Sequence, residues 1–265
     1  MTHATINEGA LHLLSESCRL LGPDLDNVLI VGGWGTFLRN QEWHPGSRDV
    51  DVLFPPDYSR DQMKKVVLRF LDDGFLVSAK HDFQIMKAIQ VGGRRYLYNV
   101  DFLHPKIEKQ NIVEYQDLIQ FDETLDGHLV KKAQSIGIRE GHLLFEEQLF
   151  ERRSVDNYGP RFLDGAGIII SKISACMNLK RRRDIYDMAL EWDQAASDIE
   201  GRIRRLATDY RRVSRWLKKT VGFNQNEPSY FRDCIRQYAD PFNRGEQAEK
   251  SLVEMFDSFE SIAHG

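Results

Sequence analysis

The residues that could do chemistry in this chain begin with two aspartates, Asp49 and Asp51, which a single valine separates. In a β-strand, residues i and i+2 point to the same face, so the two carboxylates would project side by side while Val50 and Val52 pack behind them. Neighbouring like charges repel, and a protein rarely keeps such a pair without a cation between them. The spacing therefore predicts a divalent-metal site.

A third carboxylate, Asp101, stands alone in the apolar stretch 99–103. If that strand lies beside the one that carries Asp49 and Asp51, three acids converge on one face of the sheet. A two-magnesium nucleotidyl-transfer site uses such a set: two carboxylates bridge both ions, and the third completes the ion that binds the attacking hydroxyl and takes up its proton. The alternative is that each aspartate simply ends a strand in solvent. The triplet favours the metal site.

Gly32 and Gly33 follow the apolar strand expected at residues 28–31 and precede a short helix expected at residues 34–40. Glycine at such a turn lets backbone N–H groups approach phosphate oxygens, and the helix N-terminus favours negative charge. Thr36 could donate its hydroxyl to a phosphate, or it could be an ordinary residue of the first helical turn. Tight turns also need glycine for geometry alone. Together with the carboxylates, the pair predicts a bound nucleotide.

The elements that must position these residues form a small mixed sheet followed by helices. Apolar spacing and turn residues predict helices at 5–21 and 60–72 and strands at 28–31, 48–54, 75–79, 83–90 and 95–103, with shorter strands at 121–125 and 142–145. Later helices are expected at 168–179, 183–192, 199–217, 228–238 and 246–262. We therefore expect an α/β (α+β) fold with a sheet domain at residues 1–130 and a mainly helical domain at residues 131–265.

The composition is that of an ordinary globular protein, with 42% hydrophobic and 29% charged residues among 265. No apolar run approaches the ~20 residues of a membrane span, and the first residues lack the form of a signal peptide. The three cysteines are scattered, which predicts reduced and buried thiols. We expect a cytoplasmic protein with no membrane partner.

Two motifs carry a resemblance to a known family. Residues 31–34 (Val-Gly-Gly-Trp) followed by residues 47–52 (Ser-Arg-Asp-Val-Asp-Val) resemble the signature of the nucleotidyltransferase superfamily that includes DNA polymerase β. Residues 171–175 and 183–188, with Lys172 and an Arg-Asp-x-x-Asp element, are similar to the second motif of AbiEii-type toxins, which include the MenT toxins. The resemblance implies a nucleotidyltransferase core at residues 1–130, with the helical domain adding Lys172 to the site.

The resemblance implies a magnesium-dependent enzyme that uses two Mg²⁺ ions and an NTP substrate. The residues that it places in the site are Asp49, Asp51 and Asp101 as metal ligands, Gly32, Gly33, Trp34, Thr36 and Arg48 as nucleotide contacts, Lys172 on the triphosphate, and Asp187, with Asp184 second, as the acid that orients the lysine or the nucleotide. It further implies a tRNA 3′ end as acceptor and a cognate antitoxin protein as partner, in a toxin–antitoxin or phage-defence pair.

Alternatives stay open for the helical half. Spacing alone would also allow a surface lattice of ion pairs, Lys180 with Asp184 and Arg183 with Asp187. Eight Lys or Arg residues fall between residues 202 and 219, a pattern typical of an RNA-binding surface and equally of a solvated amphipathic helix. The acceptor could instead be a protein side chain or an antibiotic-like small molecule. A non-catalytic nucleotide-binding regulator is a further alternative, against which the three repelling carboxylates argue.

Overall fold

The computed structural model describes residues 3–106, 114–120 and 132–264 of the chain. It divides into two compact units. The sheet unit comprises residues 1–34 and 47–162, and the helical unit comprises residues 35–46 and 163–265. The expected fold class, a mixed sheet with helices followed by a helical region, is confirmed. The division differs from the boundary expected at residue 130, because strands that follow this residue pair with the sheet.

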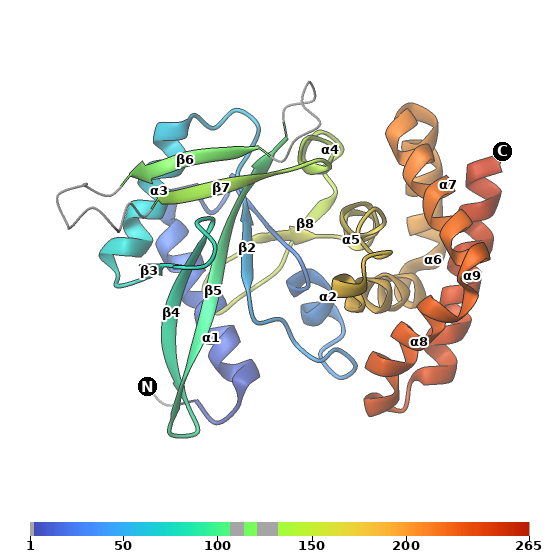
Figure 1. The fold of residues 1–265 in the computed structure, drawn as a ribbon, viewed down its shortest axis with the longest axis horizontal. Helices are drawn as coiled ribbons and strands as arrows, with labels where there is room; N and C mark the ends of the chain where they lie inside the picture. Colours follow the sequence, from blue (N-terminus) through green and yellow to red (C-terminus); the bar gives the residue numbers. More distant parts are fainter. Residues whose placement is uncertain (1–2, 107–113, 121–131, 265) are drawn as a thin grey trace. The chain divides into compact units, whose positions relative to one another are not determined.

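The sheet unit is built on a mixed sheet whose main path runs β3-β4-β5-β2-β1-β9-β8 (Figure 1). Its strands are β1 (Leu29–Val31), β2 (Val50–Leu53), β3 (Leu76–Val77), β4 (Gln84–Val91), β5 (Arg94–Pro105), β6 (Tyr115–Gln120), β7 (Lys132–Ile138), β8 (Phe150–Arg152) and β9 (Arg161–Leu163). β2 runs antiparallel to β1 and parallel to β5, and β7 joins β5 to β6. The central position of β2 places its residues between β1 and β5.

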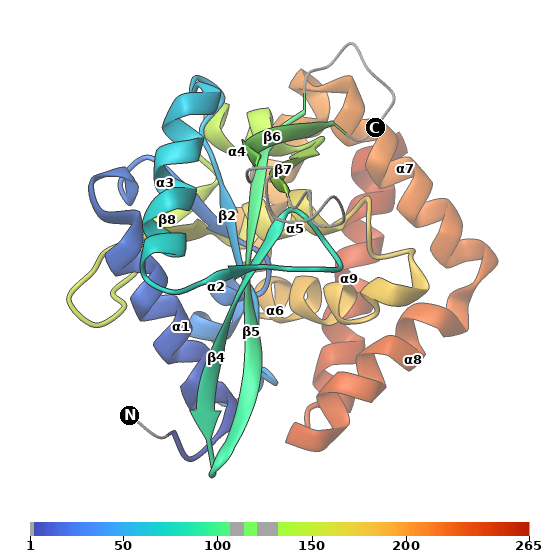
Figure 2. The same cartoon turned by 60° about the vertical axis from the view of Figure 1, so that its left-hand side comes forward.

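Helices α1 (Ile6–Leu21) and α3 (Arg60–Asp72) pack together in the sheet unit (Figure 2). The alternation expected along β5 is present, because Tyr98, Val100 and Phe102 are buried while their neighbours are more exposed. The ring of Phe102 meets that of Phe70 on α3 edge to face, with 5.7 Å between their centroids. The side of the sheet that carries Tyr98, Val100 and Phe102 therefore faces the core, and Asp101 lies on the opposite side.

The helical unit contains most of α2 (Trp34–Arg39) and the later helices of the chain. These are α5 (Gly165–Lys172), α6 (Arg183–Asp209), α7 (Arg211–Asn226), α8 (Pro228–Ala239) and α9 (Gly245–His264). Helix α6 is interrupted by Ala195, whose φ of −151° and ψ of 40° are not helical. The core of the unit includes Trp192 of α6 against Phe259 of α9, with 5.8 Å between ring centroids. Helix α6 contacts α5, α7, α8 and α9 and is thus the central helix of the unit.

Three expectations about elements need correction. Residues 142–145, expected as a strand, belong to helix α4 (Gly141–Glu146), because a short apolar run does not distinguish a buried strand from a buried helix. The helix expected at 168–179 ends at Lys172. The helix expected at 199–217 is broken at Tyr210, where the backbone is extended, and the apolar spacing simply continues across the break. The strand expected at 121–125 lies outside the described residues.

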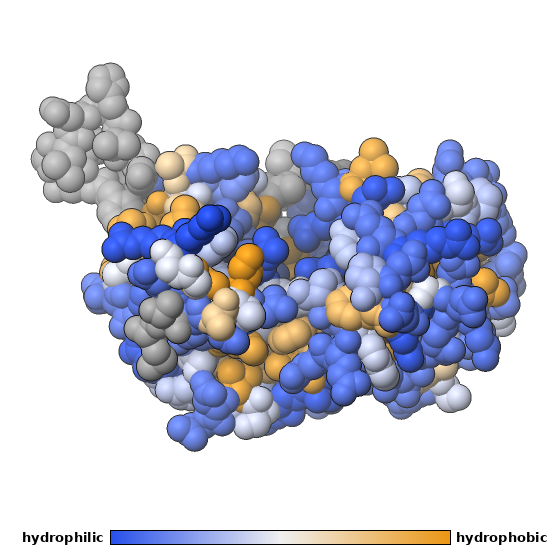
Figure 3. Space-filling view, turned by 90° about the horizontal axis from the view of Figure 1, so that it is seen from below, coloured by the Kyte–Doolittle hydropathy of each residue, from blue (hydrophilic) through white to orange (hydrophobic). Residues whose placement is uncertain are grey.

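The surface and the cysteines agree with the composition. Cys18, Cys176 and Cys234 are buried and free, as expected. Among the described residues, no helix has both the length and the apolar character that a membrane span requires. Hydrophilic residues cover most of the face seen in Figure 3, with smaller hydrophobic areas between them.

Candidate functional site

The strand register brings Asp51 and Asp101 side by side. Asp51 of β2 is the direct partner of Asp101 in parallel β5, and neighbouring strands lie about 4.8 Å apart. Val50, Val52 and Val100 turn to the opposite face and are fully buried. Two carboxylates therefore share the side of the sheet that α1 and α3 do not cover, as the alternation of the sequence predicted.

Gly32 closes one side of this pair. Its φ of +76° is a conformation that side chains rarely adopt, and a Cβ built on it would lie 2.3 Å from Oδ2 of Asp51. The carboxylate of Asp51 therefore rests directly against the glycine backbone. Gly32 has two structural reasons to be glycine, the positive φ and the contact with the carboxylate. Neither of them requires a phosphate.

Asp49 precedes β2 and is exposed, so it lies in the irregular stretch before the strand and not within it. Its backbone carbonyl accepts a hydrogen bond from Nε1 of Trp34, with 2.7 Å between the atoms. Trp34 itself is fully buried. This contact gives Trp34 a structural role at the end of the Gly32–Gly33 turn. Arg48, the residue before Asp49, is exposed.

Gln84 is a site residue that the sequence did not predict. It lies opposite Asp101 in the antiparallel pairing of β4 with β5, and its Nε2 donates to Oδ2 of Asp101 at 3.1 Å. One row across four strands thus contains Gln84, Asp101, Asp51 and Val31. Only the strand register reveals this neighbour, because a glutamine in a strand carries no signal of its own.

The two adjacent carboxylates fit a hard divalent cation, because Mg²⁺ is commonly held by one or two carboxylates together with substrate phosphates. Within the part of the chain that the structure describes, no three side chains of His, Cys, Asp or Glu are grouped closely enough to hold a metal by themselves. Of the three expected metal ligands, Asp51 and Asp101 are therefore direct neighbours on paired strands. Asp49 lies two residues before Asp51, ahead of β2. A cation at this pair would depend on substrate oxygens to complete its ligands.

Lys172 and Asp187, the two residues implied from the helical half, meet inside the helical unit. The ammonium of Lys172 lies 2.8 Å from Oδ1 of Asp184 and 2.9 Å from Oδ2 of Asp187. Arg183 adds a longer pair with Asp187 at 3.7 Å, as the helical spacing predicted. Asp187 is fully buried. The surface lattice considered for this motif does not describe it, since Lys172 and both carboxylates are inside the unit.

The pKa shifts in this cluster follow from burial and from the close charges. Burial raises the pKa of Asp187, but the positive charge of Lys172, with smaller effects of His44 and Arg183, outweighs it and lowers the pKa below its usual range. Burial lowers the pKa of Lys172, and the carboxylates of Asp187 and Asp184 outweigh that effect and raise it. The lysine and Asp187 therefore stabilise each other in their charged forms.

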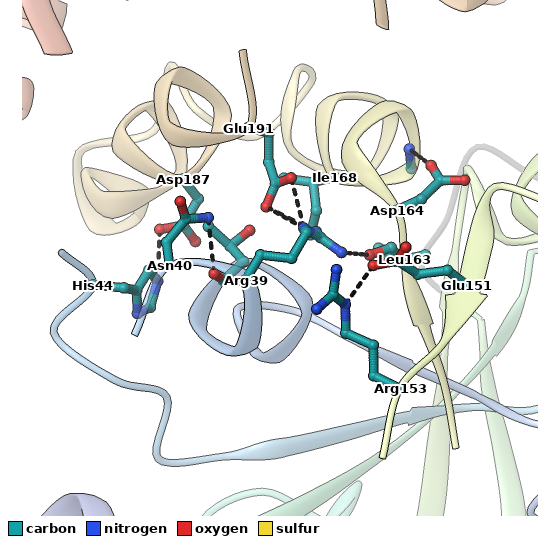
Figure 4. A network of polar contacts seen from close by, with 12 residues as sticks. Arg39, Asn40, His44, Glu151, Arg153, Leu163, Asp164, Ile168, Asp187 and Glu191 are labelled. Atoms are coloured by element: carbon teal, nitrogen blue, oxygen red, sulfur yellow. Dashed lines mark hydrogen bonds and ion pairs between the residues drawn. The ribbon is translucent and has the colours of Figure 1, made fainter. Parts of the chain in front are cut away.

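His44 connects this cluster to residues 35–46. Its Nε2 lies 3.1 Å from Oδ1 of Asp187, and its Nδ1 accepts the backbone N–H of Gly46 at 3.0 Å. Since Nδ1 is an acceptor, the neutral ring carries its proton on Nε2, and this N–H donates a hydrogen bond to the carboxylate of Asp187. We define Lys172, Asp184, Asp187 and His44 as the ionic cluster. Figure 4 shows His44 facing Asp187.

A second buried ion pair holds the same segment. Arg39, at the end of α2, donates from Nε and Nη2 to the carboxylate of Glu191 on α6 over 2.8–3.0 Å, and from Nη1 to the carbonyl of Leu163 at 3.0 Å (Figure 4). Burial raises the pKa of Glu191, and the charge of Arg39 offsets part of that shift. Thr36, on the same helix, is fully buried, which favours the interpretation of Thr36 as an ordinary helical residue.

The basic residues of the helical unit lie mostly on its surface. Arg202 and Arg204 are engaged with Asp164 and Glu200, each at 2.8 Å. On α7 four exposed cations recur at helical spacing, namely Arg211, Arg215, Lys218 and Lys219. The aromatic residues of the pattern, Tyr210 and Trp216, are partly buried. The exposed side of α7 is therefore a basic face.

Comparison of the chain with protein-family models, with curated proteins and with solved structures found no match. The resemblance to nucleotidyltransferases thus rests on the motif residues and stays a prediction. What the structure adds is the placement of those residues: a carboxylate pair against Gly32 in the sheet unit, and a buried ionic cluster in the helical unit.

Proposed function

We propose that this protein is a magnesium-dependent nucleotidyltransferase that moves NMP from an NTP to an acceptor hydroxyl. The observation that carries the proposal is the register that sets Asp51 beside Asp101, with the backbone of Gly32 against the Asp51 carboxylate. A strand pair with facing carboxylates beside a glycine turn is suited to a cation and to the phosphates that the cation accompanies.

In the proposed reaction, the acceptor oxygen bonds to the α-phosphorus while the bond from that phosphorus to the bridging oxygen breaks. Pyrophosphate leaves with the electron pair. Asp101 takes up the proton of the acceptor hydroxyl, and the hydrogen bond from Gln84 fixes the orientation of its carboxylate. Asp51 and Asp101 would hold the magnesium, with substrate oxygens completing its ligands. When bound, the ion neutralises charge that develops on the phosphates.

The acceptor that we propose is the 3′ end of a tRNA, as the resemblance implies. The basic face of α7 supports a nucleic-acid acceptor, because exposed Lys and Arg side chains bind phosphates and release counterions. Changing Arg211, Arg215 and Lys218 together to glutamine should weaken tRNA binding and flatten its dependence on salt by about 0.7–0.9 in log–log slope per lost phosphate contact. An unchanged slope would make this face a merely solvated one.

The direct test incubates the protein with each α-³²P-labelled NTP, Mg²⁺ and, in separate reactions, total cellular RNA, cellular protein and an aminoglycoside. Label on tRNA supports the proposal, and Asp51→Asn should abolish it. Label on protein or on the antibiotic keeps the chemistry and changes the acceptor. If no acceptor is labelled while NTP still binds, the regulatory alternative replaces the enzyme.

The resemblance also implies a toxin with a cognate antitoxin. Induced expression in a bacterial host should then arrest growth, and the Asp51→Asn variant, produced at the same level, should not. Growth arrest by both the wild type and Asp51→Asn would show that any toxicity does not depend on the carboxylate pair.

A further inference from the structure

Residues 35–46, here called the strap, belong to the helical unit although their neighbours on both sides belong to the sheet unit. The strap begins after Trp34 and ends before Ser47, so peptide bonds join it to the glycine turn at one end and to the stretch of Asp49 at the other. In the sheet unit, the hydrogen bond from Trp34 to the carbonyl of Asp49 ties the two ends together. The strap, which contains most of α2, is therefore a segment whose two ends are held together.

Side chains of the helical unit hold the strap along its length. Besides Arg39 with Glu191 and His44 with Asp187, Tyr186 donates its hydroxyl proton to a strap carbonyl. That carbonyl belongs to Trp43, at 2.5 Å. Arg183 donates to the carbonyl of Gly46 at 3.0 Å, and the guanidinium of Arg244 lies 4.0 Å from the Trp43 ring centroid. A segment that merely lies on a surface rarely receives so many polar partners.

The charges of the ionic cluster leave Lys172 little capacity for a triphosphate. Two carboxylates within 2.9 Å already neutralise its ammonium, and its side chain is only 7% exposed. A phosphate contact would require Lys172 to leave Asp184 and Asp187, and two buried carboxylates would lose their closest cation, which is costly inside a protein. The cluster is better suited to holding Asp187 in place, and Asp187 in turn accepts a hydrogen bond from Nε2–H of His44.

We propose that the ionic cluster is a positioning device for the strap. Lys172 orients Asp187, Asp187 orients His44, and His44 anchors Gly46, three residues before Asp49. Lys172 then influences the position of Asp49 through the strap, to which Asp49 is covalently joined, and it does not contact the triphosphate. The inference concerns the site of the proposed function, but the anchoring of the strap stands without any nucleotide transfer.

Amide hydrogen exchange tests the anchoring directly, because three strap amides are hydrogen-bonded within the helical unit: Asn40 to Thr36, Trp43 to Asn40, and Gly46 to His44. In Lys172→Met and in His44→Leu we expect these amides to exchange at least about tenfold faster. The control amide is Glu227, bonded to the carbonyl of Phe223 elsewhere in the unit. The control variant is Lys180→Met, at an exposed position.

Two matched substitutions at His44 separate its contacts even if Lys172→Met fails to fold. His44→Gln keeps a donor near the position of Nε2 and should retain protection of Asn40 and Trp43. His44→Asn keeps an acceptor near Nδ1 but loses the link to Asp187, and should expose both amides to exchange. Equal protection of Asn40 and Trp43 in wild type, His44→Asn and Lys172→Met would overturn the proposal, whether or not the protein transfers nucleotides.

Kinetics then distinguish positioning from direct binding. If Lys172 acts through His44, the losses in kcat/KM of Lys172→Met and His44→Leu should be non-additive in the double variant. If Lys172 contacts the triphosphate, its variant should raise KM for NTP at unchanged strap exchange, and the two losses should multiply. The second result would overturn the positioning role and restore the direct one. Absence of any transfer activity would refute the proposed function alone, because the exchange experiment still decides the anchoring.

Discussion

Replacing Gly32 by alanine is the perturbation that the geometry of the carboxylate pair defines best. The new Cβ would lie 2.3 Å from Oδ2 of Asp51, whereas ordinary van der Waals contact begins at about 3.4 Å. The carboxylate or the turn must therefore move by about 1 Å. Gly93, at the β4–β5 hairpin, provides a matched control, because its φ of +80° is similar and a Cβ there would meet nothing within 4 Å.

Both substitutions carry the cost of a positive φ, which is about 1–2 kcal/mol. Gly32→Ala should lose a further ~1–3 kcal/mol in the free energy of unfolding, because overpacking a closed contact costs that much. Urea unfolding followed by circular dichroism measures this difference. In addition, only Gly32→Ala should weaken Mn²⁺ binding, since only it displaces Asp51. Equal stability and equal Mn²⁺ affinity in the two variants would refute the contact between Gly32 and the carboxylate.

Three further predictions concern the helical unit. Lys172→Met should lower the free energy of unfolding by about 3–5 kcal/mol, because it removes the closest cation of two buried carboxylates. A loss no larger than that of Lys180→Met in urea titrations would contradict the buried ion pair. Because the folded pKa of Asp187 is lowered from 3.8, its contribution to stability is present above about pH 4 and is lost as the pH falls toward the folded pKa. Asp187→Asn should therefore flatten the acid limb of the stability curve, and an unchanged limb would assign acid unfolding to other groups. Arg39→Lys should loosen the strap in hydrogen exchange, because lysine cannot donate two parallel hydrogen bonds to Glu191; unchanged protection would show that the charge alone suffices.

Local patterns predicted the part of the site that depends on one strand at a time. The two-residue period of β2 and β5 correctly assigned Asp51 and Asp101 to a polar face and Val50 and Val100 to the core. That β2 lies next to β5, in a register that pairs the two aspartates, was a condition of the prediction and not a result of it. Strand order is decided by contacts between distant residues, which the sequence of one chain does not display.

The strap shows what the sequence could not indicate. Residues 41–47 have the composition of a loop, and His44 is the partner of a residue 143 positions away. Nothing in the spacing of His44 distinguishes a buried hydrogen-bonding residue from an exposed one. The sequence did indicate that buried charges would need partners, because Glu191 and Asp187 are charged residues within apolar helical stretches and a buried charge requires a partner. The identity of that partner depends on tertiary packing.

We propose above that Asp51 and Asp101 form one cation site that serves nucleotide transfer. Mn²⁺ titration by electron paramagnetic resonance, with NTP present and with wild type, Asp51→Asn, Asp101→Asn and the hairpin control Gly93→Ala, tests it most directly. We predict that each aspartate variant weakens Mn²⁺ binding at least about tenfold, about 1.4 kcal/mol, while Gly93→Ala binds like wild type. Equal Mn²⁺ affinity in wild type and both aspartate variants would contradict it.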